Sequence, residues 1–208
     1  NGQPLYSWRV LLLPYLGEED LYNTFRLDEP WDSPHNRGLV PRYESFSSPQ
    51  RPKEKNVAHY LAVVDESTIW DPNTPTSLSD VIDPPEETIA LIEVWSENIH
   101  WSEPRDLSLE QAIEFLTSRH YEKLAAVDYG FRTRPFFHYA RSRPYVLFVS
   151  DACYPLDGLE NPDLARALLT KAGGEQMDDL WASEPDTPRV TGDEPIRWDR
   201  VWGAGLWL

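Results

Sequence analysis

The stretch LYSWRVLLLPYLGEEDLYNTFRLDEPWDSPHN, residues 5–36, decides how this chain folds. Its first part carries apolar side chains with helical spacing, at Leu5, Trp8, Leu12, Tyr15 and Leu16. Proline removes a helical hydrogen bond and glycine favours the left-handed conformation, so Pro14 and Gly17 end this segment. The spacing predicts a short helix with one covered apolar face.

Two further short helices are predicted in the same stretch. The acidic residues 18–20 open the second helix, where carboxylates face the positive end of the helix dipole. Ser33 and Pro34 open the third, as an N-cap and a proline at the first helical position. Because helices this short are not stable alone, we expect them to pack their aromatic side chains, Trp31 included, onto a sheet.

Three later segments have the composition of β-strands. Residues 57–65 are β-branched and aromatic, and residues 87–95 form a nearly continuous apolar run, as in a strand covered on both faces. Residues 136–151 predict a hairpin with its turn near 141–144. The segments between these strands are polar and rich in proline, as loops are.

Two longer helices are predicted at 108–120 and 161–174. Ser108 and Gln111 form a capping box at the start of the first. The second has Asn161 as its N-cap, a proline at its first position and the glycine pair 173–174 as its C-cap.

The order of these elements predicts an α+β fold with a central, mostly antiparallel sheet covered by several short helices. A single α+β domain is expected over residues 1–176. Residues 177–208 are expected to form an acidic, Trp-rich extension that packs on this domain or trails from it.

The charge of the chain excludes several classes of partner. With 35 acidic and 19 basic residues, the net charge is -16, which repels nucleic acid and anionic lipid. The longest apolar run, at residues 10–16, is interrupted by Pro14 and is too short for a membrane span. Cys153 is the single cysteine, so no internal disulfide forms.

No arrangement of residues indicates an active site. The histidines lack the spacing of a zinc motif, so we expect no transition metal; if one were found, His59, His100 and His138 would be the ligands to examine. Ser150 and Cys153 have no indicated base nearby. The sequence predicts neither a cofactor nor a catalytic residue.

The acidic residues leave two other uses open. Glu93 and Glu97 are the nearest pair of carboxylates for glycoside chemistry. Residues 28–32 and 71–80 are oxygen-rich candidates for calcium binding, although neither follows the EF-hand pattern. Solvated loop surface is the simpler interpretation of both.

Glu93 differs from the other acidic residues because it lies inside a predicted buried strand. An ionised carboxylate in such a place is costly unless it is paired or hydrogen-bonded. We therefore expect its oxygens to meet an Arg, a Lys or backbone N–H groups, with Arg9 as the first candidate.

The opening stretch, SWRVLLLPYL followed by LYNTFRLDEPWDSPHN, resembles a planctomycete family, the domain of unknown function 1559. Residues 59–68 are similar to the family's next strand, residues 79–107 to its central strand and the loop after it, and residues 166–175 to its closing helix. The structural signature consists of Trp8, Arg9, Trp31, Asp32, Ser33, His35, Asn36 and Glu93.

The resemblance implies a pseudopilin-like globular head at the cell surface or in the envelope, and an old label of the family is solute-binding. The family's prepilin segment is expected to be absent from this chain. Its carboxy-terminal H-X9-DG signature is degraded, because His138 and Asp151 are separated by twelve residues and Ala152 stands at the glycine position. An altered turn is expected there.

These implications favour a non-enzymatic envelope or extracellular protein that contacts protein partners in a structural or interaction role. The alternative is a small-ligand or glycan-binding module in which exposed Trp side chains stack on sugars. A hydrolase that uses acidic residues is a third possibility.

Overall fold

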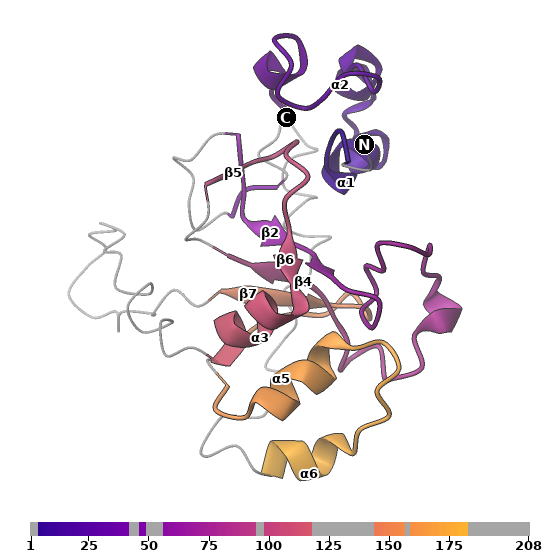
Figure 1. Ribbon diagram of the computed structural model, residues 1–208, viewed down its shortest axis with the longest axis vertical. Coiled ribbons are helices and arrows are strands. Elements are labelled where there is room, and N and C mark those ends of the chain that lie inside the picture. The colour runs from indigo at the N-terminus through magenta and orange to yellow at the C-terminus, as the bar shows by residue number, and fades with distance from the viewer. Residues whose placement is uncertain are drawn as a thin grey trace, which may run out of the picture. The chain divides into compact units, whose positions relative to one another are not determined.

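The computed structural model describes residues 4–41, 46–48, 56–94, 98–117, 144–156 and 159–182. Its helices and antiparallel strands confirm the α+β class (Figure 1). The chain forms two compact units: unit 1 comprises Asn1–Leu61 and Glu93–Asp106, and unit 2 comprises Ala62–Ile92 and Leu107–Leu208. The sequence predicts one domain that ends at residue 176, and a boundary at that position stays a prediction.

Unit 1 is built from short helices and short strands. The helical elements are α1 (Trp8–Leu12), the 3-10 helix η1 (Leu13–Leu16), α2 (Glu19–Thr24) and the 3-10 helix η2 (Asn36–Gly38). Strands β1 (Val57–Ala58) and β5 (Ile99–His100) pair antiparallel, and β2 (Tyr60–Leu61) follows β1. Gly17 ends η1 as predicted, with a φ of 76°.

Helix α1 turns a different face inward from the one that the spacing predicts. Val10 and Leu13 are buried, whereas Leu12 and Tyr15 are 37% and 85% exposed. Because the segment contains three consecutive leucines, an apolar stripe runs along more than one side of the helix, and spacing alone does not select its rotation. The buried side also carries Arg9.

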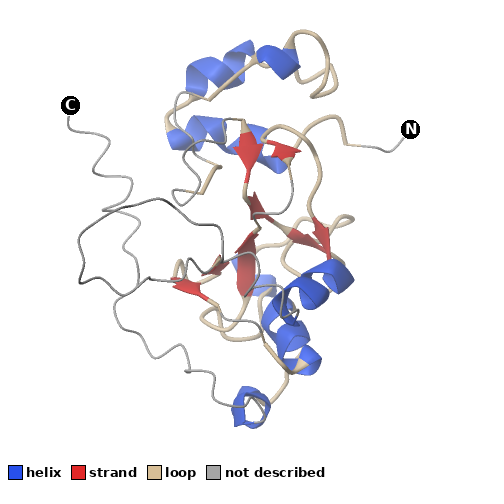
Figure 2. Ribbon diagram, turned by 90° about the vertical axis from the view of Figure 1, so that its left-hand side faces the viewer, coloured by secondary structure: helices blue, strands red, loops and turns tan. Residues whose placement is uncertain are grey.

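Unit 2 combines a small sheet with helices (Figure 2). Strand β4 (Ile89–Glu93), whose last residue belongs to unit 1, pairs antiparallel with β7 (Tyr145–Phe148), which pairs antiparallel with β8 (Cys153–Pro155). Strands β3 (Val63–Val64) and β6 (Leu107–Ser108) are parallel. The helical elements are the 3-10 helix η3 (Leu78–Asp80), α3 (Leu109–Thr117), α5 (Pro162–Leu169) and α6 (Met177–Ala182). Helices α3 and α5 pack together and bury Leu116, Leu164 and Leu168 completely.

The starts of both longer helices are confirmed. The Ser108 N–H donates to Oε1 of Gln111 at 2.9 Å, and the Gln111 N–H donates to Oγ of Ser108 at 3.2 Å, so the capping box forms. Asn161 caps α5 by accepting from the Asp163 N–H at 2.9 Å. All described helices are short, and none of them has the length and apolar character needed to cross a membrane.

The predicted strand at 57–65 is broken into three short strands because successive pieces have different neighbours. Strand β1 pairs with β5, and β3 pairs with β6. Between β1 and β2, the His59 N–H donates to the carbonyl of Phe46 at 2.8 Å.

The hairpin predicted at 136–151 lies partly outside the described residues, as does His138. Strand β7 forms a hairpin with β8, and the intervening turn contains Asp151 with a φ of 65°. Aspartate tolerates this left-handed conformation better than most residues, which permits a tight turn with Ala152 at the glycine position.

The glycine pair after α5 does not cap the helix, so that prediction is wrong. Helix α5 ends at Leu169, and Thr170 is its C-cap. The N–H groups of Gly173 and Gly174 instead donate to the two carboxylate oxygens of Asp83, at 2.7 and 2.9 Å. These N–H groups are therefore satisfied by an acidic residue that is distant in the sequence.

Two glycines of unit 1 provide a matched test of backbone strain. A side chain at Gly17 or at Gly38 would meet no heavy atom within 4 Å, but only Gly17 has a positive φ. We expect Gly17→Ala to lower the free energy of unfolding by about 1–2 kcal/mol, as an L-residue in the left-handed region does. Gly38→Ala should leave it unchanged or raise it by about 0.4–1 kcal/mol. Urea unfolding of both variants measures this, and equal losses would contradict it.

Candidate functional site

The centre of unit 1 is the side chain of Arg9, which is fully buried. Ser7 precedes α1 as its N-cap, and its Oγ accepts from the backbone N–H of Arg9 at 3.3 Å. The Ser7 N–H donates to the carbonyl of Ser102 at 2.9 Å, which ties the start of α1 to the segment after β5.

The guanidinium of Arg9 has polar partners on several sides. Nη2 lies 2.8 Å from Oδ1 of Asp106 and 2.7 Å from the carbonyl oxygen of Tyr60, and Nη1 donates to Oγ of Ser7 at 2.7 Å. The indole N–H of Trp8 donates to the other carboxylate oxygen of Asp106 at 3.1 Å, and the Trp8 ring lies 4.6 Å from Cζ of Arg9. Burial lowers the pKa of Arg9, whereas the charge and hydrogen bond of Asp106 raise it. The carboxylate thus helps to keep the buried guanidinium charged.

The prediction that Arg9 pairs with Glu93 is wrong, because the carboxylate at Arg9 is that of Asp106. Glu93 is fully buried at the end of β4, as expected. The segment after β5 returns to the start of α1 through the Ser7–Ser102 bond and places Asp106 at the guanidinium. The broader prediction, that the Glu93 carboxylate meets a Lys, another Arg or backbone N–H groups, stays a prediction.

Asn36, the last residue of the opening stretch, holds the loop that precedes it. Its buried side chain donates through Nδ2 to the carbonyls of Arg26, Glu29 and Pro30, at 2.9, 3.3 and 3.1 Å. Its Oδ1 accepts from the Arg26 N–H at 2.9 Å. One side chain therefore adds to the few backbone hydrogen bonds of this loop, in which the carbonyls of Arg26 and Pro30 also accept from backbone N–H groups.

Three other residues of the WDSPHN segment make contacts that stabilise unit 1. Oγ of Ser33 accepts from the Asn36 N–H at 3.1 Å, so it caps the turn that leads into η2, and the helix begins later than predicted. His35 bonds through Nε2 to the carbonyl of Thr24 at 2.9 Å. Trp31 is half-buried rather than largely buried, and it stacks on His100 of β5 with ring centres 5.4 Å apart. Asp32 is exposed.

Aromatic side chains of the opening stretch build the apolar core of unit 1. Trp101 is 1% exposed, and its ring lies 6.1 Å from those of both Phe25 and Phe46. Its indole N–H donates to the carbonyl of Leu39 at 3.1 Å. Phe25, the C-cap of α2, is buried, whereas α2 itself buries no residue, so the packing of the short helices on a sheet stays a prediction.

The opposite side of the first helical segment is apolar and exposed. Leu11, Leu12 and Tyr15 have exposed fractions of 48%, 37% and 85%, and their spacing places them on one helical face. We call these three residues the α1–η1 apolar face. The acidic residues Glu19 and Asp20, also exposed, follow in α2.

The sequence-predicted alternatives for chemistry do not converge on one place. His59 is buried, and its Nδ1 accepts from the Ser48 N–H at 2.9 Å. His100 lies 2.9 Å from Oγ of Ser102, and burial, followed by the charge of Arg37, lowers its pKa. Among the described residues no three His, Cys, Asp or Glu side chains gather as metal ligands would.

The other residues considered for catalysis do not form a described cluster. Ser150 is exposed in the β7–β8 turn, whereas Cys153 is buried in β8. Glu97, the proposed partner of Glu93 in glycoside chemistry, lies outside the described residues, as does His138.

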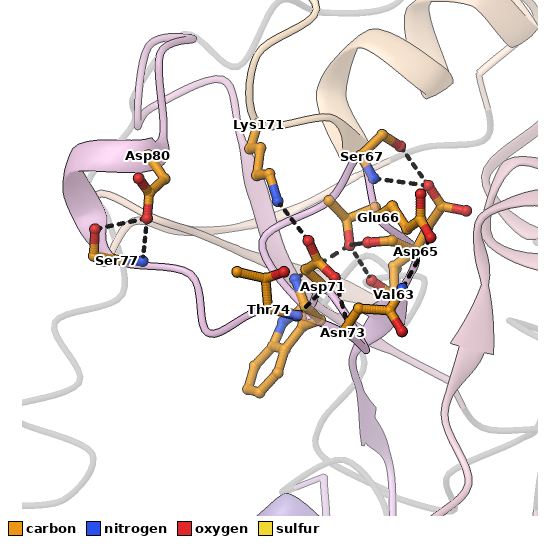
Figure 3. A network of polar contacts seen from close by, with 12 residues as sticks. Val63, Asp65, Glu66, Ser67, Asp71, Asn73, Thr74, Ser77, Asp80 and Lys171 are labelled. Carbon is orange, nitrogen blue, oxygen red and sulfur yellow. Dashed lines mark hydrogen bonds and ion pairs between the residues drawn. The ribbon is translucent and has the colours of Figure 1, made fainter.

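The oxygen-rich segment 71–80 forms a network of loop contacts in unit 2 (Figure 3). The carboxylate of Asp71 accepts from the N–H groups of Asn73 and Thr74, at 2.8 and 3.1 Å, and lies 3.5 Å from Nζ of Lys171. The backbone N–H of Asn73 is the largest cause of the lowered pKa of Asp71. Asp80 likewise accepts from the N–H and the hydroxyl of Ser77, both at 2.7 Å. These acidic groups stabilise the loop through its own donors.

Sequence reasoning missed Asp106 and Asp83. Neither of them stands in an apolar run that would mark it as buried. Their importance depends on partners far away in the chain, Arg9 and the Gly173–Gly174 pair.

Residues 1–92 match the model of a family described as "Protein of unknown function (DUF1559)". The resemblance of the opening stretch to this family is therefore confirmed over that range, which includes α1 through β4 as far as Ile92. No curated protein and no solved structure matches the chain.

The buried ion pair can be tested against a surface pair in the same unit. Asp106→Leu leaves the Arg9 charge buried without its carboxylate and should lower the free energy of unfolding by about 3–5 kcal/mol. The double variant Arg9→Met/Asp106→Leu should recover much of that loss. The control Arg26→Gln removes the exposed pair with Glu29 and should cost at most about 1 kcal/mol. Urea unfolding of the set is the measurement; a loss in Asp106→Leu no larger than in the control would refute the pairing.

A second series tests the WDSPHN loop. Asn36→Ala removes a buried side chain with several hydrogen bonds to the backbone, each worth about 0.5–1.5 kcal/mol, so its loss of unfolding free energy should be the largest of the series. Ser33→Ala should cost about 1 kcal/mol, as a lost cap does. Asp32 is exposed, so Asp32→Ala should change the free energy of unfolding by no more than about 0.5 kcal/mol. Hydrogen exchange of residues 26–36 should speed up only in the first two variants; unaltered exchange in Asn36→Ala would remove its assigned role.

Proposed function

We propose that this chain, whose residues 1–92 carry the DUF1559 match, is a non-enzymatic, pseudopilin-like head domain with a structural or interaction role at the cell envelope or surface. Its partners in this role are other proteins. The pseudopilin-like character and the location rest on the family resemblance, and the interaction role rests on the surface of unit 1.

The observation that carries the interaction role is the α1–η1 apolar face. The polar residues of the same stretch, Arg9 and Asn36 above all, are buried and bonded within unit 1. Leu11, Leu12 and Tyr15 meanwhile remain exposed on a helix whose rotation Arg9 sets. Burying a large apolar side chain contributes about 1.5–3 kcal/mol, so a partner that covers this face gains binding energy from each of them.

The hydrogen bonds and ring contacts of the described histidines give each of them a structural use. His59 accepts a backbone hydrogen bond, and His100 stacks on Trp31. In the segment 71–80, shown in Figure 3, the carboxylates accept hydrogen bonds from backbone N–H groups of the same segment. We therefore assign no catalytic step to these residues.

One observation favours the alternative of a glycan or small-ligand module. Trp31 is half-exposed and stacked on His100, which leaves part of a flat aromatic surface open to a sugar face. The indole N–H groups of Trp8, Trp70 and Trp101 are bonded within their own units, so these side chains contribute structure. Quenching of Trp fluorescence by glycans, lost in Trp31→Ala, would favour this alternative.

The interaction role can be tested by photo-crosslinking in the cells that produce the full-length protein. A benzophenone amino acid in place of Tyr15 should give a discrete protein adduct in the envelope fraction, because this side chain is 85% exposed on the apolar face. The same amino acid in place of Asn23, an exposed polar residue of α2, is the matched control and should give none. Leu11→Ser in the Tyr15-labelled protein should reduce the adduct.

Two outcomes would count against the proposal. If Tyr15 and Asn23 crosslinked alike, the apolar face would have no special affinity for a partner. If the protein fractionated with the cytosol, the envelope location would be wrong.

A further inference from the structure

The two large apolar side chains that are most exposed in the described part of unit 2 lie close together in the chain. Leu78 is 79% exposed and Ile82 is 77% exposed. Both belong to the segment 77–87, which joins the network of Figure 3 to β4. We call this segment the acidic loop edge. It is separate in sequence from the α1–η1 apolar face of unit 1.

Hydrogen bonds hold the backbone of the loop edge at several points. Ser77 and Asp80 form a capping box around η3. The N–H groups of Ile82 and Asp83 donate to the carbonyl of Lys171 at 2.7 and 3.2 Å. The Asp83 carboxylate binds the N–H groups of Gly173 and Gly174, where Gly174 has a φ of 70°.

These bonds fix the backbone on both sides of the exposed side chains. A preordered surface loses less conformational entropy when it binds a partner. Leu78 and Ile82 are therefore presented to solvent by a loop that need not be reorganised on binding.

The loop edge contains four acidic residues and no basic one, and the acidic residues are Asp80, Asp83, Glu86 and Glu87. Partial burial raises the pKa of Glu87, and the charges of Glu86, Asp178 and Asp83 raise it further. Lys171, the one lysine that Figure 3 labels, lies 3.5 Å from a carboxylate oxygen of Asp71. A cationic partner would relieve the repulsion between these carboxylates.

We propose that the acidic loop edge is a docking surface for a basic, amphipathic segment of another protein. Leu78 and Ile82 insert into the apolar side of that segment, and its Lys or Arg residues meet Glu86, Glu87 and Asp178. A second copy of the chain is a poor occupant, because each copy carries a net charge of -16. Anionic lipid is repelled for the same reason.

The test uses two synthetic peptides of equal length, an amphipathic helix of Leu and Lys and its counterpart of Leu and Glu, with affinity measured by calorimetry. The Leu–Lys peptide should bind and the Leu–Glu peptide should not. Leu78→Ser/Ile82→Ser should weaken binding by at least about tenfold, since lost burial of two side chains exceeds 1.4 kcal/mol. Glu86→Gln/Glu87→Gln should weaken it as well and reduce its dependence on salt.

Leu5→Ser/Val40→Ser is the matched control, because it removes two other apolar side chains, 43% and 51% exposed, that belong neither to the loop edge nor to the α1–η1 apolar face. This variant should bind the Leu–Lys peptide as the wild type does. In the wild-type chain, the peptide should also slow hydrogen exchange at residues 77–83, a readout that does not depend on any variant folding.

Three results would overturn the proposal. The first is no binding of the Leu–Lys peptide. The second is binding that Leu78→Ser/Ile82→Ser leaves intact, which would mean attraction by net charge alone. The third is an equal loss in the Leu5→Ser/Val40→Ser control. None of these results bears on the crosslinking test of Tyr15, so the two proposals fail independently.

Discussion

A guanidinium is stable inside a protein only when its charge and its donors are satisfied, and unit 1 is arranged around this requirement of Arg9. Asp106 supplies the opposite charge, while Tyr60 and Ser7 supply acceptors from two other segments. Segments that are far apart in the chain must therefore meet at one point before the side chain can be buried. The rotation of α1, and with it the exposure of the opposite face, follows from this constraint.

Polar side chains also bind backbone groups in two other parts of the chain. Asn36 adds hydrogen bonds to the backbone of residues 26–30, and Asp83 accepts from the N–H groups of Gly173 and Gly174. Short helices and two-residue strands leave many backbone groups unpaired, and buried groups of that kind must find partners. Most residues that carry the resemblance to the family thus hold loops and helix ends in place.

If the polar signature residues stabilise the fold, the residues available for contact are the exposed apolar ones. Tyr15 with its neighbours in unit 1, and Leu78 with Ile82 in unit 2, are exposed on rigid local frames. The whole chain carries a net charge of -16, which repels nucleic acid and anionic lipid. The interaction role proposed above rests on these exposed apolar side chains.

The sequence by itself determined the features that depend on neighbouring residues. Ser108 with Gln111, Asn161 with its following proline, and Gly17 after η1 all behave as their local chemistry predicts, because a cap bonds within its own helical turn. The α+β class and the burial of Glu93 followed from apolar patterning. Only the tertiary structure decided which side of α1 faces inward, that Asp106 rather than Glu93 pairs with Arg9, and that Asp83 takes the glycine N–H groups. Each of these depends on which distant segments meet, and neither periodicity nor local propensity contains that information.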